Sequence, residues 1–326
     1  MIVSRVTAIA LAGSMCVAIH ARAQMKSAEY PQRPIRILIG IAPGGGLDAL
    51  TRVAAQKLSE RLGQTAVVDN RPGGGTVIAM DLVQQAAPDG YTLLCASETL
   101  MLNGVLKRSR YDVRKAFVPI VHLTIQPYLM VVNPSLPVAS VKELIAHAKA
   151  RPGALSYGTP GVGTTLHIGW ERFMAMSGIE IVHVPYKGGA PAVVDVMSGQ
   201  IQMTITTTIT AGPHMKTGKL KALAFTGPRR VQAYPDLPTV AESGLPGFEL
   251  TNSYGFYAPA GTPAVIVHKI NATMIEVMSS PETRKILAAD GVEAAPPGTP
   301  GEFKARFERD YAELEKTIAS AKITLR

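Results

Sequence analysis

Cysteine is scarce in this sequence, and histidine is scattered. Only two of the 326 residues are cysteine, at positions 16 and 95, which excludes a disulfide scaffold and any zinc or iron–sulfur site built from several cysteines. The six histidines after residue 100 lack the spacing typical of metal ligands, so we expect structural or surface roles for them. The sequence therefore predicts no metal site and no cofactor.

Aromatic and charged residues are also few. Aromatic residues make up 6% of the chain and charged residues 17%, with 33 Lys and Arg against 24 Asp and Glu, a formal charge of +9. No run of Lys or Arg is longer than two residues, whereas nucleic-acid-binding proteins concentrate positive charge in a stripe, often beside stacking aromatics. We therefore interpret the excess charge as a dispersed basic surface and expect no nucleic-acid partner.

The sequence also lacks an apolar run long enough to cross a bilayer, which takes about 20 residues. The apolar stretch Val6–Ile19 is shorter, follows Arg5 and precedes Ala21–Ala23, the features of a cleaved secretory signal peptide. We expect residues 1–23 to be removed and the protein to be exported to the periplasm. Cleavage removes Cys16 and leaves Cys95 in an apolar run, where we expect a buried, inert thiol.

What the chain does contain is a repeated alternation of short apolar strands with amphipathic helices. The predicted strands are 35–41, 66–69, 91–97, 128–133, 156–159, 181–184, 201–206 and 221–225. Helices are predicted at 48–62, 76–87, 140–150 and 190–198. Another helix is expected to follow the glycines at 161–163 and to end at 176. This β-α-β order is typical of largely parallel sheets and indicates two α/β domains. Three last helices, each opened by a proline, are expected at 263–279, 281–289 and 300–321, and they could cover the first domain if the chain crosses back near 253–259.

Two glycine-rich turns, Ala42–Asp48 and Gly158–His167, each join a strand to the following helix. Such turns lie at the carboxyl edge of a parallel sheet, where ligands bind in these folds. The helix N-terminus offers unpaired N–H groups and a positive dipole end, and glycine lets backbone approach an anion. If the two domains face each other, the turns predict an organic acid held by both ends. Taken singly, each turn is equally compatible with a structural role, and pattern alone leaves the role of Gly73–Gly75 open.

The sequence contains few of the motifs that are typical of enzymes. The turns contain no P-loop and no complete G-x-G-x-x-G, and the chain has no G-x-S-x-G elbow and no H-E-x-x-H. Asp48 and His167 are the only acid–base pair that can be placed in the cleft, on different domains. Lys187, in another strand-to-helix turn, could offer its ammonium group to an acid, although a lone turn lysine is commonly only solvated. We expect Trp170 in the core.

From Tyr30 onward the chain resembles the Bug-type periplasmic receptors of the tripartite tricarboxylate transporter family. The matching motifs, in order, are Tyr30–Ile35, Pro43–Gly45 with Asp48, Asn70–Gly74, Pro88–Leu93, Asn133–Pro137, Tyr157–Gly163, His183–Gly189, Asp236–Gly244 and Ala258–Pro263. The resemblance implies a type II periplasmic binding protein fold, two α/β lobes joined by two crossover strands. We expect residues 24–127 and 255–326 to form lobe 1 and residues 128–254 to form lobe 2.

The resemblance also implies a carboxylated solute between the Pro43–Gly46 and Gly161–Thr165 turns, often bound through ordered waters. Together with the turn chemistry it predicts these ligand-site residues: Pro43, Gly44, Gly45, Gly46, Asp48, Ser97, Thr99, Asn103, Thr159, Gly161, Val162, Gly163, Thr164, Thr165, His167, Lys187, Thr206 and Tyr254. Relatives often carry an acid or amide where this chain has Thr206–Thr208, and an aromatic where it has Ser253. Without an acid to face its ammonium group, an amino acid becomes a poorer ligand.

The sequence therefore predicts a monomeric periplasmic receptor, not an enzyme. It would close two lobes around a di- or tricarboxylate or an aromatic acid and deliver it to cognate membrane transporter subunits. Three alternatives stay open. One is a sensor of the same solutes that signals to a membrane kinase, the second is a hydrolase using the Asp48–His167 pair, and the third is a scaffold without a ligand.

Overall fold

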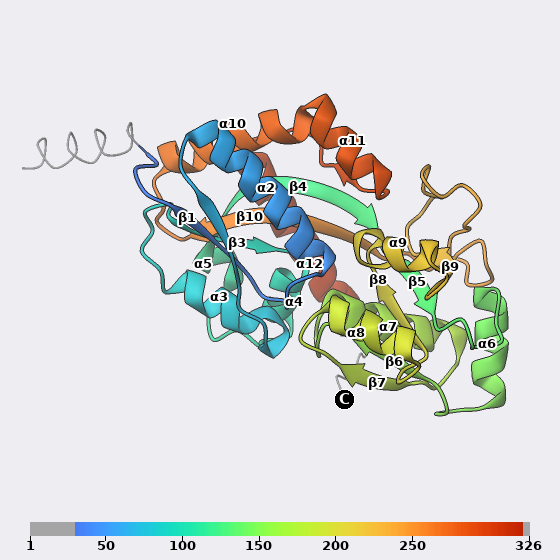
Figure 1. The fold of residues 1–326 in the computed structure, drawn as a ribbon. Helices are drawn as coiled ribbons and strands as arrows, with labels where there is room; N and C mark the ends of the chain where they lie inside the picture. The colour runs from blue at the N-terminus through green and yellow to red at the C-terminus, as the bar shows by residue number, and fades with distance from the viewer. Residues whose placement is uncertain (1–29, 322–326) are drawn as a thin grey trace, which may run out of the picture.

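The computed structural model describes residues 30–321, so the expected signal peptide lies outside the described residues. Two β-sheets organise the chain, one with strand order β11-β4-β10-β3-β1-β2 and one with order β7-β6-β8-β5-β9 (Figure 1). We call each sheet with its helices a lobe. This is the α/β architecture of two lobes that the sequence and the resemblance predict. Within residues 30–321 no helix is long and apolar enough to cross a membrane.

The first lobe is built on the six-stranded sheet. Its strands are β1 (Ile35–Ile39), β2 (Ala66–Asn70), β3 (Thr92–Ala96), β4 (Phe117–Pro127), β10 (Thr251–Pro259) and β11 (Glu293–Ala294). Strand β1 runs parallel to β2 and β3, whereas β10 runs antiparallel to both of its neighbours, β3 and β4. The parallel part brings the ends of β1 and β3 to one edge, and the helices that follow them begin at the cleft.

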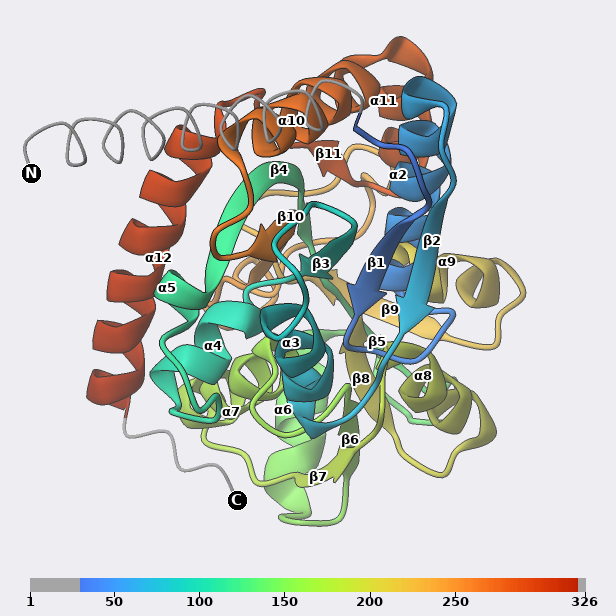
Figure 2. The ribbon, with the colours of Figure 1, turned by 90° about the vertical axis from the view of Figure 1, so that its left-hand side faces the viewer.

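Helices cover both faces of this sheet (Figure 2). On one face Leu50 and Ile270 pack with Ile37, and on the other Met80 and Phe307 pack with Leu94. The helices of the first face are α2 (Gly46–Leu62), α10 (Ala264–Ser279) and α11 (Pro281–Ala289). Those of the second are α3 (Val77–Gln84), α4 (Thr99–Val105), α5 (Val113–Ala116) and α12 (Pro300–Ala321). The prediction that the last helices cover the first domain is confirmed.

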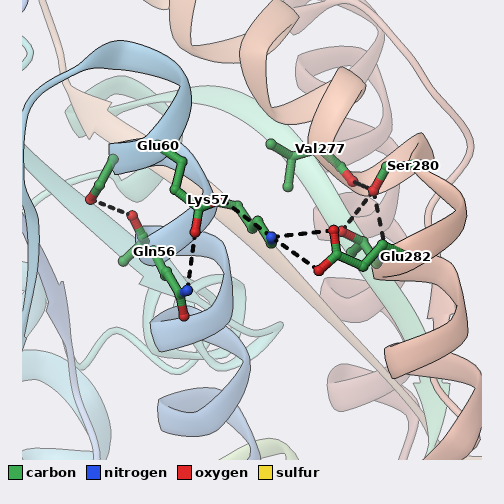
Figure 3. A network of polar contacts seen from close by, with 9 residues as sticks. Gln56, Lys57, Glu60, Val277, Ser280 and Glu282 are labelled. Carbon is green, nitrogen blue, oxygen red and sulfur yellow. Dashed lines mark hydrogen bonds and ion pairs between the residues drawn. The ribbon is translucent and has the colours of Figure 1, made fainter.

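A polar network on the surface joins two of these helices, although they are far apart in sequence (Figure 3). The Lys57 ammonium of α2 donates to Glu60 at 3.2 Å and to Glu282 of α11 at 3.2 Å. Because exposed ion pairs contribute little to stability, the buried apolar face beneath this network is what holds α10 and α11 in place.

The second lobe is built on the five-stranded sheet. Its strands are β5 (Leu129–Val132), β6 (Ser156–Thr159), β7 (Val182–Pro185), β8 (Met203–Thr206) and β9 (Lys221–Phe225). Its helices are α6 (Val141–Ala150), α7 (Thr165–Ser177), α8 (Gly189–Ser198) and α9 (Thr208–Lys216). Trp170 is fully buried among them, as predicted. The predicted start of α6 is also confirmed, since the Ser140 side chain accepts from the Glu143 N–H at 3.2 Å.

Strands β4 and β10 connect the two lobes. They pair antiparallel, with irregular register near Tyr254 and Tyr257, and only Tyr128 separates β4 from β5. The chain therefore leaves the first sheet at residue 128 and returns to it after β9. The lobe boundaries at 127/128 and 254/255 stay predictions, and β10 itself begins at Thr251 in the first sheet.

Candidate functional site

A cavity of about 70 Å³ lies between the two lobes. The first lobe contributes the ends of β1 and β3 and the start of α2, and the second contributes the starts of α7, α8 and α9. Tyr128 and Tyr254, from the connections between the lobes, complete its wall. The cavity therefore lies where the sequence placed the carboxyl edges of both sheets.

Two helices that begin with glycine at this cavity have no side-chain cap at their N-terminus. Helix α2 follows Gly45 and helix α8 follows Gly188, and neither position carries a capping hydrogen bond from a side chain. The N–H groups of a first helical turn have no partner within the helix, and the dipole makes this end positive. Gly45, Gly46 and Gly189 line the cavity, so each lobe presents an uncapped, glycine-flanked helix start to it.

Two further helix N-termini at the cavity, those of α7 and α9, are capped by threonine. Thr164 accepts from the His167 N–H at the start of α7, and Thr207 accepts from the Thr210 N–H at the start of α9. The Thr164 hydroxyl also donates to the Gly161 carbonyl at 2.8 Å. These hydroxyls thus shape the turns. The Thr206 side chain, by contrast, is buried at the cavity, and its hydroxyl has no hydrogen-bond partner in the described part of the chain.

No ionisable Asp, Glu, Lys, Arg or His side chain belongs to the cavity wall formed by residues 30–321. Its polar groups are hydroxyls, among them Ser97, Thr99 and Thr165, together with backbone N–H groups. The Thr99 and Thr165 hydroxyls lie 3.1 Å apart and join the lobes directly. Such a wall can stabilise a carboxylate by dipoles and hydroxyl donors, but it offers no counter-charge to an ammonium group.

Asp48 supports the first glycine turn from behind. Its carboxylate accepts from the Gly44 N–H at 3.0 Å and from the Asn70 amide at 2.9 Å, and it pairs with Arg52 at 2.9 Å. Burial acts to raise the pKa of Asp48, but the hydrogen bonds from Arg52, Gly44 and Asn70 lower it overall. The carboxylate is therefore charged and fully engaged away from the cavity.

His167 supports the second glycine turn in the same way. Its Nδ1 accepts from the Gly163 N–H at 3.1 Å, its ring stacks on His183 at 4.1 Å between centroids, and its Nε2 lies 3.6 Å from a Glu171 oxygen. Burial, with a contribution from Arg108, lowers the pKa of His167 to about 4. Neither Asp48 nor His167 lines the cavity, so the structure does not bring this acid–base pair together there.

The predicted site residues thus fall into two groups. Those that line the cavity are Gly45, Gly46, Ser97, Thr99, Thr164, Thr165, Thr206 and Tyr254. Those that lie outside its lining are Pro43, Gly44, Asp48, Asn103, Thr159, Gly161, Val162, Gly163, His167 and Lys187. Most of the second group hold the turns. Thr159 bonds His183 at 2.7 Å, and it is the Lys187 carbonyl, not its ammonium group, that accepts from the Ala42 N–H across the cleft at 2.8 Å.

Several lining residues were not predicted. Gly189, Thr207 and Thr210 each follow a strand end, and the T-x-x-T spacing of the two threonines is a helix-cap signal that could have found them. Tyr128 carries no such signal. Cys95 lies in the wall and is fully buried, as predicted, and burial raises the pKa of its thiol to about 12. Ser253 is absent from the lining and hydrogen-bonds the Glu98 carboxyl instead.

Comparison with known proteins bears on this geometry. A family model described as the tripartite tricarboxylate transporter family receptor matches residues 50–321. The chain belongs to this receptor family. The receptor is 35% identical to the protein BugT of Bordetella pertussis, over 90% of this chain and 92% of that protein. It is 34% identical to a UPF0065 protein in the tcbD-tcbE intergenic region of a Pseudomonas species, over 93% and 90% of the two chains.

Solved structures agree with the fold of the receptor. The Rhodopseudomonas palustris protein Rpa4515, solved with adipate, has a TM-score of 0.87 and 35% identity, covering 90% of this chain and 99% of that one. MatC from the same organism, solved with bound malate, has a TM-score of 0.84 and 26% identity, covering 89% and 100%. The periplasmic binding protein BugD has a TM-score of 0.86 and 29% identity, covering 90% and 99%. The Bug-type resemblance and the two-lobe fold are confirmed.

Proposed function

We propose that this receptor captures a small organic carboxylate between its lobes in the periplasm and delivers it, as a monomer, to the membrane subunits of a tripartite transporter. The observation that carries the proposal is the cavity between the lobes, where helix N-termini and hydroxyls converge without any ionised side chain. Backbone N–H groups at helix starts are a general solution for holding carboxylates. The family to which the chain belongs and the periplasmic neighbours support the location and the partner.

The ligand class follows from the arrangement of the donors. One uncapped helix start, α2, belongs to the first lobe and another, α8, to the second, so a dicarboxylate can place one carboxylate at each. The adipate and malate in the neighbours Rpa4515 and MatC support this class. A tricarboxylate or an aromatic acid uses the same donors. We place the ligand contacts at Gly45, Gly46, Thr99, Thr165 and Thr206, with no catalysis.

A ligand screen tests this function. The protein is purified from the periplasm, unfolded and refolded to strip bound solute, and melted with adipate, malate, citrate, aromatic carboxylates and neutral sugars. A ligand at 100 times its dissociation constant stabilises the native state by about 2.7 kcal/mol, a shift of several degrees in the midpoint. We expect shifts with one class of acid and none with sugars. A folded protein that responds to no acid, or to sugars equally, contradicts the proposal.

A further inference from the structure

The segment that follows α4 carries an arginine in an unusual backbone setting. Lys107 adopts a left-handed conformation with φ 52°, at the position where helices commonly end in glycine. The next N–H, of Arg108, donates to the Asn103 carbonyl at 2.8 Å. A lysine at a left-handed position is strained, so the structure holds Arg108 at this point against a local preference.

The Arg108 guanidinium hydrogen-bonds both lobes. Its Nη1 donates to the Val162 carbonyl in the second glycine turn, and its Nη2 donates to the Gly74 carbonyl in the third turn at 3.2 Å. Asn103 steadies the third turn through an amide hydrogen bond to the Gly75 carbonyl at 2.8 Å. Among residues 30–321 no carboxylate pairs with Arg108, so its hydrogen bonds all go to main-chain oxygens.

The glycines around Arg108 are required by close approach of the lobes. A Cβ at Gly75 would lie 2.6 Å from the Val162 oxygen, and a Cβ at Gly163 would lie 2.1 Å from Arg108 Nη1. Gly75 and Gly163 also have φ values of 60° and 75°, which disfavour other residues. The Gly73–Gly75 turn, whose role the sequence left open, therefore meets the second glycine turn across the cleft instead of lining the cavity.

We propose that Arg108 is a positioning residue for ligand capture, a clasp that fixes the second glycine turn against the first lobe whenever the lobes are closed. The proposal rests on the proposed function. Arg108 does not line the cavity, so its hydrogen bonds stabilise the closed lobes to the same extent whichever acid is inside. Opening breaks the bond to Val162, and the clasp therefore sets how long the ligand stays bound.

Binding kinetics test the clasp with Arg108→Ala and a matched control, Arg229→Ala. Arg229 also joins the lobes, through Glu293 at 2.6 Å, but both side chains are largely exposed, at 75% and 66%, and such pairs contribute little. With adipate and malate as probes, we expect Arg108→Ala to raise both dissociation constants about 10-fold or more. The increase should come from faster release, with association unchanged. Unchanged release, or a factor that differs between the two acids, overturns the proposal.

A second measurement tests the clasp independently of ligand affinity. Spin labels on Gln56→Cys in the first lobe and Glu180→Cys in the second report the separation of the lobes, and buried Cys95 stays unlabelled. We expect Arg108→Ala to shift the distance distribution toward open lobes and Arg229→Ala to leave it unchanged. If the wild type binds neither acid, the proposed ligand class fails while this comparison still judges the clasp. Distributions that match in all three proteins overturn it.

A conservative variant distinguishes the loss of the clasp from a folding defect. Arg108→Lys keeps the charge but lacks the planar fork that reaches two carbonyls at once. We expect its release rate to lie between those of the wild type and Arg108→Ala, at an unchanged melting midpoint. A lysine variant as fast as alanine with a lowered midpoint would mean that Arg108 supports the fold and not closure.

Discussion

Three buried histidines stay neutral at physiological pH: His122, His167 and His183. Burial lowers the pKa of each to about 4, because the protein interior disfavours the charged ring. For His167 this neutral form is also the functional one, since its Nδ1 can accept the Gly163 N–H only when it is unprotonated. A residue that the sequence proposed as a ligand contact is thus better explained as the support of a turn.

This arrangement predicts acid sensitivity. Between pH 6.5 and 4 the unfolded chain binds protons at these histidines that the folded protein does not, so the free energy of unfolding falls as the pH falls. We expect His167→Gln, which can still accept the Gly163 N–H but does not titrate, to remove about 2 to 3 kcal/mol of that loss. Urea unfolding at pH 7 and pH 4.5 measures it. An identical pH slope in both proteins would show that His167 titrates normally.

Glu98 makes the stability depend on pH in the opposite direction. Burial raises its pKa to about 7, against hydrogen bonds from Ser253, and its Oε2 is buried without a partner in the described residues. The folded protein holds this proton more tightly than the unfolded chain, so the stabilisation is complete below about pH 4.5 and is lost as the pH rises through 7. We expect Glu98→Gln to gain about 3 kcal/mol in unfolding free energy at pH 8 relative to wild type, and nothing at pH 4. A gain that is equal at both pH values contradicts this assignment.

At the scale of elements, helix starts determine what the cleft can hold. The sequence predicted most helix and strand positions, since β1, α2, β2, β3 and the last three helices lie within a few residues of expectation. Each has a simple period and a clear glycine or proline boundary. Strand β4 was expected only through the crossover strands that the family resemblance implies, and β10 only as a return of the chain near 253–259. Both strands are irregular and mix Pro119, Pro127, Asn252 and Ser253 with apolar residues. Helix α9 was missed because Pro213 and its threonines hide its period.

The start of α2 gives a test at this scale. A Cβ at Gly46 would lie 2.3 Å from Thr207 Oγ1 of the other lobe, so Gly46→Ala is expected to hold the lobes apart and weaken adipate or malate binding at least 10-fold. Calorimetric titration measures the affinity. Gly301→Ala is the matched control, since it also lies in a first helical turn and its Cβ would have open space, with only Thr299 Oγ1 at 3.9 Å. Equal affinity in both variants would mean that the lobes close without this contact.

At the scale of the whole molecule, the site exists only where two separately predictable lobes meet. The sequence identified both glycine turns, but it could not say which of their atoms face the cavity, because that depends on how the lobes are placed. Asn103 and Lys187 illustrate the point. Both were predicted as ligand contacts, yet Asn103 bonds the third turn and Lys187 joins the lobes through its carbonyl.

The lining as a whole predicts selectivity between two ligands that differ by one group. Glutarate and glutamate have the same carbon chain and two carboxylates, but glutamate adds an ammonium group. Because no carboxylate of residues 30–321 lines the cavity, enclosing that group leaves a buried charge unpaired. We expect glutarate to stabilise the receptor at concentrations where glutamate, even 100-fold higher, does not. Comparable thermal shifts would mean that an acid reaches the bound ligand.

The position of β10 also determines the order in which the two sheets are completed as the chain is synthesised. This strand lies between β3 and β4 in the first sheet, yet the whole second lobe is encoded before it. A chain that emerges from its N-terminus therefore completes the five-stranded sheet while the six-stranded sheet still lacks an interior strand. The lobe that begins first in sequence finishes last, and until residue 259 has emerged β3 and β4 have no strand between them. The return of the chain thus completes the cleft, since Tyr254 of β10 is the last residue of its wall to emerge.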